Sequence, residues 1–449
     1  MPPPFDALFH QGVQLMQQGD AAGAANAFRA TLALAPGLAA AHVNLGLLSA
    51  RGGDRAAAEQ HYRTALAGDP AHVHALLHLG VLLAAQKRFM EAESLYLQAL
   101  LVEPASPVAL SHLGVLLACL ERDAEAERCY RAALAIAPDD RTAMFNLAYL
   151  LLRQGRFKEG WAAYEARASY AGLARHFQCP RWRGETLAGK TLVIGVEGGH
   201  GDMIQFSRYA RVAKDLGAAR VALVCHPGLK TLFARGAGID TVYGYDEDVP
   251  AAGWDYWTPP MSFPHMLGVE TIPASLPYLY ADPVKADSWA PLVAVAGQRL
   301  RVGLAWQGNP RFENDGDRSL ASTAVLAPLL EIDGACFFSV QKDRPDGALP
   351  PGVTDLAPHL ADFDDTAACI AQLDLVISID SAVAHLAGAL GKPCWVLLPG
   401  YKTDWRWLAG RTDSPWYPGA VRLFRQTDAG DWRGVVQAMA AALQERVAA

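Results

Sequence analysis

The residues best placed to do chemistry lie in Asp374–Gly400, which reads DLVISIDSAVAHLAGALGKPCWVLLPG. Its pattern predicts a buried strand, a polar turn, a helix and a second buried strand. Asp380 and Ser381 occupy the turn, and His385 lies in the first part of the helix. Ligands of open parallel sheets bind beyond the carboxyl ends of the strands, and the start of a helix favours a phosphate. These side chains are therefore predicted to meet a ligand, although the first two can equally cap the helix and His385 can be a core histidine.

A second polar turn follows the strand predicted at 191–196, and a helix is expected from 203 to about 216. The turn is Glu197-Gly198-Gly199-His200-Gly201-Asp202. Its three glycines permit a close approach of the backbone and positive φ angles. The pattern is neither GxGxxG nor a P-loop, so the turn by itself is only a weak indication of a ligand site.

A third polar turn is expected after the strand at 301–306. Gln307 and Asn309 lie in it, and a polar loop at 314–319 follows with Arg318 near its end. Because strands alternate with helices from residue 191 onward, we expect parallel sheets in two α/β halves, 191–300 and 301–449. An ordered junction is predicted over 173–190. The tryptophans and tyrosine between 405 and 417 can either wall a pocket or pack into a core.

The N-terminal part of the chain repeats with a period of 34 residues. The matching positions are Pro36, Pro70, Pro104 and Pro138; Gly12, Gly46, Gly80 and Gly114; and Phe28, Tyr62, Tyr96, Tyr130 and Tyr164. This is the tetratricopeptide period and pattern, and it predicts an α-solenoid of about five units over residues 1–172. We expect each proline to end a second helix and each aromatic ring to fill the groove of the next unit.

One column of the repeats contains only hydrogen-bonding side chains without a fixed charge. It consists of His10, Asn44, His78, His112 and Asn146. Similar arrays in protein O-GlcNAc transferases hold an extended peptide with an asparagine column, so the resemblance suggests a peptide groove. The alternative is the polar outer face of an ordinary scaffold.

The segment from Asp380 through His385 to Gly391 and Pro393 resembles the heptosyltransferase type of glycosyltransferase, family 9. The resemblance covers about 185–440. It implies a GT-B arrangement of two Rossmann-like halves, in which the second half binds a nucleotide sugar through Asp380, Ser381 and His385. Asp202 matches the family's aspartate that activates the acceptor hydroxyl. It can instead be a helix cap, where an acid is electrostatically favoured.

The same resemblance implies a basic residue that grips the phosphates of the donor. Arg318 is the match, with Arg311 as its competitor and an unassigned surface arginine as the alternative. Lys342 is a second phosphate candidate, and Gly199, His200 and Gly201 are expected in the loop near the site. No metal is expected, because no DxD pair lies in a suitable loop and helix dipoles can replace a cation.

Composition bounds the remaining possibilities. A net charge of −7 and a pI near 6.0 argue against a general role in binding nucleic acid or a membrane surface. Seven scattered cysteines without a CxxC pair favour a reducing cytosol, and neither a secretory signal nor a membrane span is predicted. The sequence thus predicts a cytoplasmic, metal-independent glycosyltransferase acting on a polypeptide bound by the repeats, with self-association possible. The alternatives are a binding scaffold with a degenerate transferase region and, more weakly, a sugar-nucleotide epimerase.

Overall fold

The computed structural model describes residues 4–167, 169–170, 172–342 and 349–448. The chain folds as two compact units, residues 1–150 and 151–449. The predicted domain boundary lay at residue 172. The first unit instead ends at Leu150, because helix α10 (Phe157–Tyr164) packs on α14 (Phe263–Met266) of the second unit.

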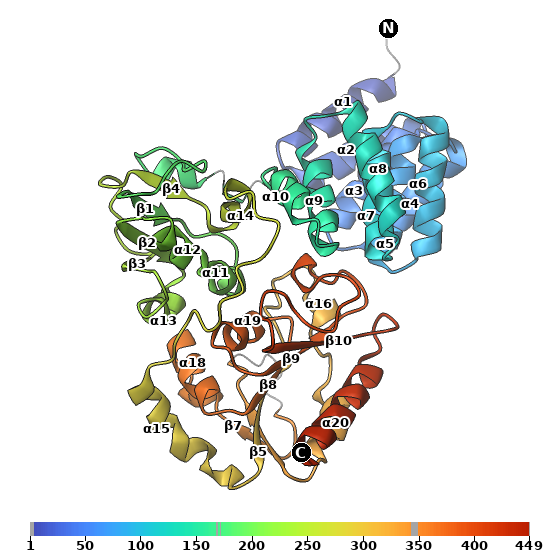
Figure 1. Ribbon diagram of the computed structural model, residues 1–449. Coiled ribbons are helices and arrows are strands. Elements are labelled where there is room, and N and C mark those ends of the chain that lie inside the picture. Colours follow the sequence, from blue (N-terminus) through green and yellow to red (C-terminus); the bar gives the residue numbers. More distant parts are fainter. Residues whose placement is uncertain (1–3, 168, 171, 343–348, 449) are drawn as a thin grey trace. The chain divides into compact units, whose positions relative to one another are not determined.

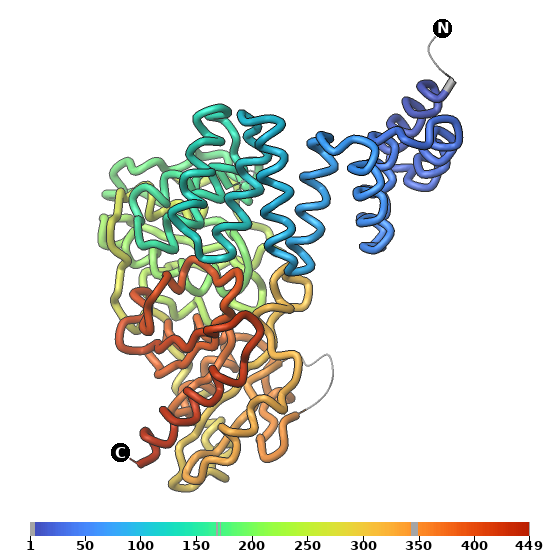
Figure 2. Tube along the Cα trace, turned by 90° about the vertical axis from the view of Figure 1, so that its right-hand side faces the viewer, coloured from blue at the N-terminus to red at the C-terminus, as the bar shows by residue number. Residues whose placement is uncertain are grey.

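The first unit is an array of antiparallel helix pairs. The pairs are α1 (Pro4–Gln17) with α2 (Ala21–Leu34), α3 (Ala39–Arg51) with α4 (Arg55–Gly68), α5 (Val73–Ala85) with α6 (Phe89–Val102), and α7 (Pro107–Cys119) with α8 (Asp123–Ile136) (Figure 1). The second helix of each pair also packs on the first helix of the next, so the pairs stack in chain order along the blue part of the tube in Figure 2. The prolines lie two residues beyond the second helices, as predicted. The solenoid therefore has the expected tetratricopeptide construction.

In the first four units the aromatic ring packs against the glycine of its own unit, a contact that the sequence analysis did not predict. A Cβ at Gly46 would come within 2.4 Å of Tyr62, and one at Gly80 within 2.4 Å of Tyr96. Tyr62 also stacks on His78 of the next unit, with ring centroids 5.8 Å apart. The ring thus fills the gap that the missing side chain leaves and then reaches the neighbouring unit.

The second unit contains two parallel sheets. The first has the order β3-β2-β1-β4 and consists of β1 (Thr191–Ile194), β2 (Arg220–Cys225), β3 (Thr241–Gly244) and β4 (Tyr256–Thr258). The second has the order β10-β9-β8-β5-β6-β7 and consists of β5 (Leu300–Ala305), β6 (Ala335–Ser339), β7 (Val353–Asp355), β8 (Leu375–Ile379), β9 (Cys394–Leu398) and β10 (Val421–Arg425) (Figure 1). The strand order reverses beside β1 in one sheet and between β5 and β8 in the other. The fold therefore is an α-solenoid followed by two Rossmann-like α/β halves, as predicted.

Helix boundaries differ from the predictions in several places. The helix expected from residue 203 begins earlier, as α11 (His200–Phe206), and a break separates it from α12 (Tyr209–Asp215). The predicted polar loop at 314–319 contains a short helix, α16 (Asp315–Arg318), and a further short helix, α13 (Lys230–Phe233), lies between β2 and β3. In addition, α15 (Pro283–Val293) packs on α18 (Phe363–Ala371), so it covers the second sheet although the sequence placed it in the first half.

Candidate functional site

The reversal of strand order places the three predicted polar turns at equivalent points of the two sheets. The turn with Asp202 follows β1, the turn with Gln307 follows β5, and the turn with Asp380 follows β8. Such switch points are where open α/β sheets bind ligands, because neighbouring connections leave the sheet toward opposite faces there. The helices that begin at the first and third turns, α11 and α19 (Ala382–Ala389), pack on each other (Figure 1).

Asp202 lies in the first turn of α11 and accepts a hydrogen bond from the backbone N–H of Gly199, at 2.7 Å. Gly198 has a φ of +70°, and a Cβ there would lie 2.4 Å from the Asp202 carboxylate. This glycine is required both by its backbone conformation and by the position of the acid. The side chain of Asp202 keeps 26% of its surface exposed, so a further hydrogen-bonding group can still reach it.

The contact between α11 and α19 is close enough to require Gly201. A Cβ at this position would come within 2.9 Å of His385 and 3.5 Å of the Ala382 backbone. His385 is 5% exposed, and its Nδ1 lies 2.8 Å from the Tyr417 hydroxyl. Its ring also stacks on Trp407, with centroids 5.1 Å apart. Burial, together with nearby arginines, places the pKa of His385 well below its ordinary value, so the ring is neutral. His385 thus has the position of a packed core histidine, and the donor contact predicted for it stays a prediction.

Arg406 joins the two halves at the point where these helices meet. It belongs to the short 3₁₀ helix Trp405–Trp407, and its guanidinium is buried. It donates to Asp202 and, at 2.6 Å, to Gln205 on α11. It also donates to both oxygens of Asp404, each at 3.0 Å. Asp202 therefore has a cationic partner from the other half of the unit.

Asp380 and Arg318 lie together on the second sheet, as the predicted phosphate site requires. Arg318 donates to the backbone carbonyl of Asp380 at 3.0 Å and to the carboxylate of Asp315 at 3.2 Å. Ser381 caps α19 by accepting from the N–H of Val383 at 3.2 Å, so its capping interpretation is correct and a ligand contact stays a prediction. The side chain of Arg318 keeps 17% of its surface exposed, whereas its competitor Arg311 is an exposed residue.

The carboxyl group of Asp380 resists ionisation. Burial and then the neighbouring Asp404 carboxylate raise the pKa of Asp380 to about 6, against the opposing effect of Arg318. A raised pKa means that the folded state favours the neutral acid. The stability that this group contributes is therefore complete below about pH 4 and is lost as the pH rises through about 6.

Replacing Asp380 by asparagine is expected to remove that loss. Relative to wild type, the free energy of unfolding of Asp380→Asn should rise by up to about 3 kcal/mol between about pH 4 and about pH 7. Urea denaturation at several pH values measures this difference. Asp413→Asn, which alters an exposed carboxylate, should show no such change. If the free energy of unfolding of Asp380→Asn differs from that of wild type by the same amount at both pH values, burial does not raise the pKa of Asp380.

The remaining predicted residues border these turns. His200 is an exposed residue, and its ring lies tilted against His226 and stacked on Phe363 at centroid distances of 4.5 and 5.0 Å. Desolvation by these rings, followed by the charges of His226 and Lys342, lowers the pKa of His200 to about 4. Lys342 itself is exposed and donates to the carbonyl of Ala361.

Two polar residues of the turn after β5 differ in their surroundings. The backbone N–H of Gln307 donates to the side chain of Gln341 at 2.9 Å. The side chain of Asn309 is exposed and accepts from the N–H of Arg311 at 3.0 Å. Whether either residue contacts a ligand stays a prediction.

The aromatic cluster near the C-terminus is core rather than a pocket wall. Trp405, Trp407, Trp416 and Tyr417 are fully buried, and Trp161 of α10 packs edge-on against Trp405 at 5.2 Å. Sequence reasoning noticed these rings but missed the role of the arginine among them. An arginine embedded in a run of tryptophans is itself a signal, because a buried guanidinium requires charged or polar partners.

The column of the repeats predicted as a peptide groove is only partly accessible. His10 is exposed, whereas Asn44, His78, His112 and Asn146 are half-buried. Burial lowers the pKa of His78 to about 4 and also lowers the pKa of His112, which stacks on Tyr96. The two central histidines are therefore neutral and partly engaged with the repeat's own tyrosines.

The first turn of the site is anchored to the end of the repeats by a buried ion pair. Glu197 lies after β1, directly before the glycines. Its carboxylate accepts hydrogen bonds from Arg167 at 2.6 and 3.1 Å and from Ser169 at 2.6 Å. Arg167 also donates to Glu165 at 2.8 Å and to Ser262 at 2.7 Å. The pairing with both glutamates raises the pKa of Arg167, although burial opposes this. Earlier repeat units have alanine at the matching positions, Ala65, Ala99 and Ala133, so the arginine at 167 serves this docking rather than the repeat.

Neither a metal cluster nor a membrane helix was found in the described part of the chain. Among those residues, no three His, Cys, Asp or Glu side chains are grouped so that they could hold a metal ion. No helix among them is long and apolar enough to cross a bilayer.

Comparison with family models finds repeats in the N-terminal part of the chain and a transferase-like segment in its C-terminal part. Residues 12–112 match the middle TPR-like domain of cilia and flagella-associated protein 70, and residues 120–174 match a tetratricopeptide repeat model. Residues 345–399 match the glycosyltransferase family 9 (heptosyltransferase) model, which includes Asp380, Ser381 and His385. The chain therefore combines tetratricopeptide repeats with a segment similar to family 9 transferases.

The chain is also similar to individual known proteins. Protein FlbA of Caulobacter vibrioides is 30% identical over 320 residues, which cover 65% of this chain. The chain spans about half the length of that relative, 53%. Among solved structures, PilF of Pseudomonas aeruginosa aligns at 21% identity with a TM-score of 0.37, covering 47% of this chain and 86% of its own. A thermophilic tetratricopeptide protein of Thermus thermophilus aligns at 26% identity with a TM-score of 0.32, covering 36% and 88%.

Proposed function

We propose that the chain is a nucleotide-sugar-dependent glycosyltransferase that modifies a polypeptide held by its repeats, in the cytoplasm. The observation that carries the proposal is the meeting of α11 and α19. It brings the candidate base Asp202 and the candidate donor turn at Asp380 to neighbouring switch points, inside a region that the family 9 model partly covers. Neither the helix contact nor the family match alone indicates an enzyme, because a protein can keep a fold without its catalytic activity.

Each group has a defined role in the proposed reaction. A hydroxyl of the acceptor loses its proton to Asp202 as its oxygen bonds to the anomeric carbon of the sugar. The bond from that carbon to the diphosphate breaks at the same time, so negative charge grows on the leaving nucleotide. Arg318 and the N–H groups at the start of α19 offset that charge, with Lys342 as a further candidate.

Metal independence is part of the proposal and has its own test. Asp315 and Asp317 have DxD spacing, but the Asp315 carboxylate already accepts from Ser319 at 2.9 Å and from Arg318. We therefore assign the leaving-group charge to the arginine. Excess EDTA should leave the rate unchanged, whereas a loss of activity that Mg²⁺ or Mn²⁺ restores would contradict the assignment.

The experiment that tests the function is a panel of nucleotide sugars that covers the common bases. The full chain is incubated with each donor and a lysate-derived polypeptide mixture, and nucleotide release is followed together with the mass of labelled polypeptides. One donor is expected to release nucleotide and to label protein. Release without labelled protein would argue for hydrolysis or epimerisation instead, and no release with any donor would contradict the proposal.

A binding scaffold is the second candidate, and the filled meeting point of the two halves favours it. Arg406 occupies one oxygen of Asp202, and Trp407 and Tyr417 enclose His385. Nucleotide binding separates the two candidates. A nucleotide present at about 100 times its dissociation constant should stabilise a transferase by about 2.7 kcal/mol, whereas a scaffold should show no shift in Tm with any nucleotide.

A further inference from the structure

The third repeat unit carries an apolar stripe on its outer surface. Met90, Leu97 and Leu101 of α6 are 87%, 48% and 82% exposed. They lie on one side of the helix, because steps of seven and four residues both return to the same face. The opposite face is buried and consists of Ala92, Tyr96 and Ala99. A helix that is apolar on both faces is typical of one that is covered on both sides.

The other repeat units show that the stripe is not needed for the repeat itself. One or two steps of 34 residues from Met90 lead to alanine at 22, 56 and 124, and the same steps from Leu101 lead to alanine at 33, 67 and 135. The counterparts of Leu97 are arginines at 29, 63 and 131. The third unit alone replaces this small and charged set by three large apolar side chains.

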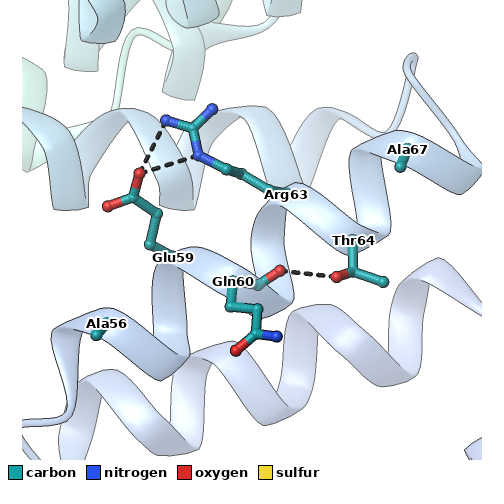
Figure 3. A pocket seen from close by; sticks show the side chains of 6 residues that line it. All are labelled: Ala56, Glu59, Gln60, Arg63, Thr64 and Ala67. Atoms are coloured by element: carbon teal, nitrogen blue, oxygen red, sulfur yellow. Dashed lines mark hydrogen bonds and ion pairs between the residues drawn. The ribbon is translucent and has the colours of Figure 1, made fainter.

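The neighbouring outer helix has a hollow where α6 has its ridge. The hollow on α4 is lined by Ala56, Glu59, Gln60, Arg63, Thr64 and Ala67 (Figure 3). Its two alanines are the counterparts of Met90 and Leu101. The same outer surface therefore presents a ridge on one helix and missing side-chain volume at the matching positions of the next.

The charges between ridge and hollow compensate one another. Arg63 pairs with Glu59 at 2.8 Å and with Glu91 at 3.3 Å. Arg88 pairs with Glu59 at 2.9 Å and with Glu91 at 2.7 Å. Two arginines and two glutamates cancel, so a second copy of this surface would meet no net repulsion.

We propose that this surface, the α4–α6 face, binds the α4–α6 face of a second copy of the chain. In a two-fold pair the ridge of each copy enters the hollow of the other, which is the reciprocal contact of an isologous interface. A ridge alone would be enough to bind a different protein. A ridge and a matching hollow on the same face make that face complementary to a second copy of itself. Two helices from each copy form an interface at the small end of the usual range, below about 1,200 Å², so the dimer is weak and concentration-dependent. The proposal is independent of sugar transfer.

Sedimentation velocity of the full chain from low micromolar to near-millimolar concentration tests the pairing. Wild type is expected to shift from monomer to dimer over this range. The variant Met90→Ala/Leu97→Arg/Leu101→Ala carries the residues that the other units already have at these positions, so the repeat should keep its fold. Its dimer dissociation constant should rise by about tenfold or more, because the buried apolar anchors are gone.

A second variant examines the hollow without touching the stripe. Ala67→Arg adds a long charged side chain there and should weaken the dimer to a similar degree. Val284→Ala, which shortens a side chain that is 79% exposed on α15, is the matched control and should leave the dimer unchanged. The proposal is overturned if wild type stays monomeric, if the triple variant still dimerises like wild type, or if Ala67→Arg leaves the dimer intact.

Discussion

Replacing Asp202 by asparagine is expected to lower the rate of sugar transfer by about 10²–10⁴-fold, with little change in fold or nucleotide binding. The reason is the proton of the acceptor hydroxyl, which a neutral amide cannot accept as the new bond forms. Asparagine keeps an oxygen for the N–H of Gly199, which Asp202 now binds at 2.7 Å. The substitution thus keeps the helix cap but weakens the pair with Arg406, which retains both oxygens of Asp404. Thermal unfolding is therefore needed to separate the loss of this pair from the loss of proton transfer. Capping alone is worth about 1 kcal/mol of stability and would not alter the chemical step.

Initial rates under saturating donor, together with thermal unfolding, measure this difference. Asp215→Asn is a suitable control, because that carboxylate is exposed at the end of α12 and pairs with Arg211. The nucleotide-induced rise in Tm should be the same in wild type and Asp202→Asn. If Asp202→Asn transfers sugar at the wild-type rate, Asp202 is not the base of the reaction. If its Tm is clearly below that of wild type, the role of Asp202 is structural.

The repeats and the two sheets were predictable because their signals are local. A period of 34 residues is visible without any structure, and each glycine of the repeat has a local partner in the aromatic ring sixteen positions later. The β-branched runs before Asp202 and Asp380 likewise predict buried strands, and polar turns after them follow directly. Parallel connectivity then placed both turns at the carboxyl edges of their sheets.

The contacts that join the halves were not predictable, because their partners are far apart along the chain. Arg406 reaches Gln205 across 201 residues. Arg208 donates to the carbonyls of Gln205, Pro273 and Trp416, at 2.8 to 2.9 Å. Arg208 lies in the break between α11 and α12, directly before α12, so a helix that the sequence predicts as continuous is interrupted where this arginine turns toward the other half. At such a position, tertiary hydrogen bonds override the intrinsic helix propensity of the residues.

Replacing Arg167 by methionine is expected to destabilise the second unit by about 3–5 kcal/mol. The side chains of Arg167 and Glu197 are 2% and 0% exposed, so removing the cation leaves a buried carboxylate without its main partner. Replacing both residues by methionine should cost clearly less than the sum of the two single changes, because the unpaired charge is then absent. The difference between the sum and the double variant measures the coupling.

Tryptophan fluorescence during urea denaturation reports this effect in the right part of the molecule. All 11 tryptophans lie at or beyond residue 161, hence in the second unit, whereas far-ultraviolet circular dichroism also follows the helices of the repeats. Arg211→Met, which removes an exposed pair with Asp215, is the control and should change stability little. Because Glu197 begins the turn that carries Asp202, loss of this pair should also loosen the candidate base. If the fluorescence and dichroism transitions of Arg167→Met shift equally, the two units unfold as one. If the fluorescence transition does not shift, the buried pair does not stabilise the turn.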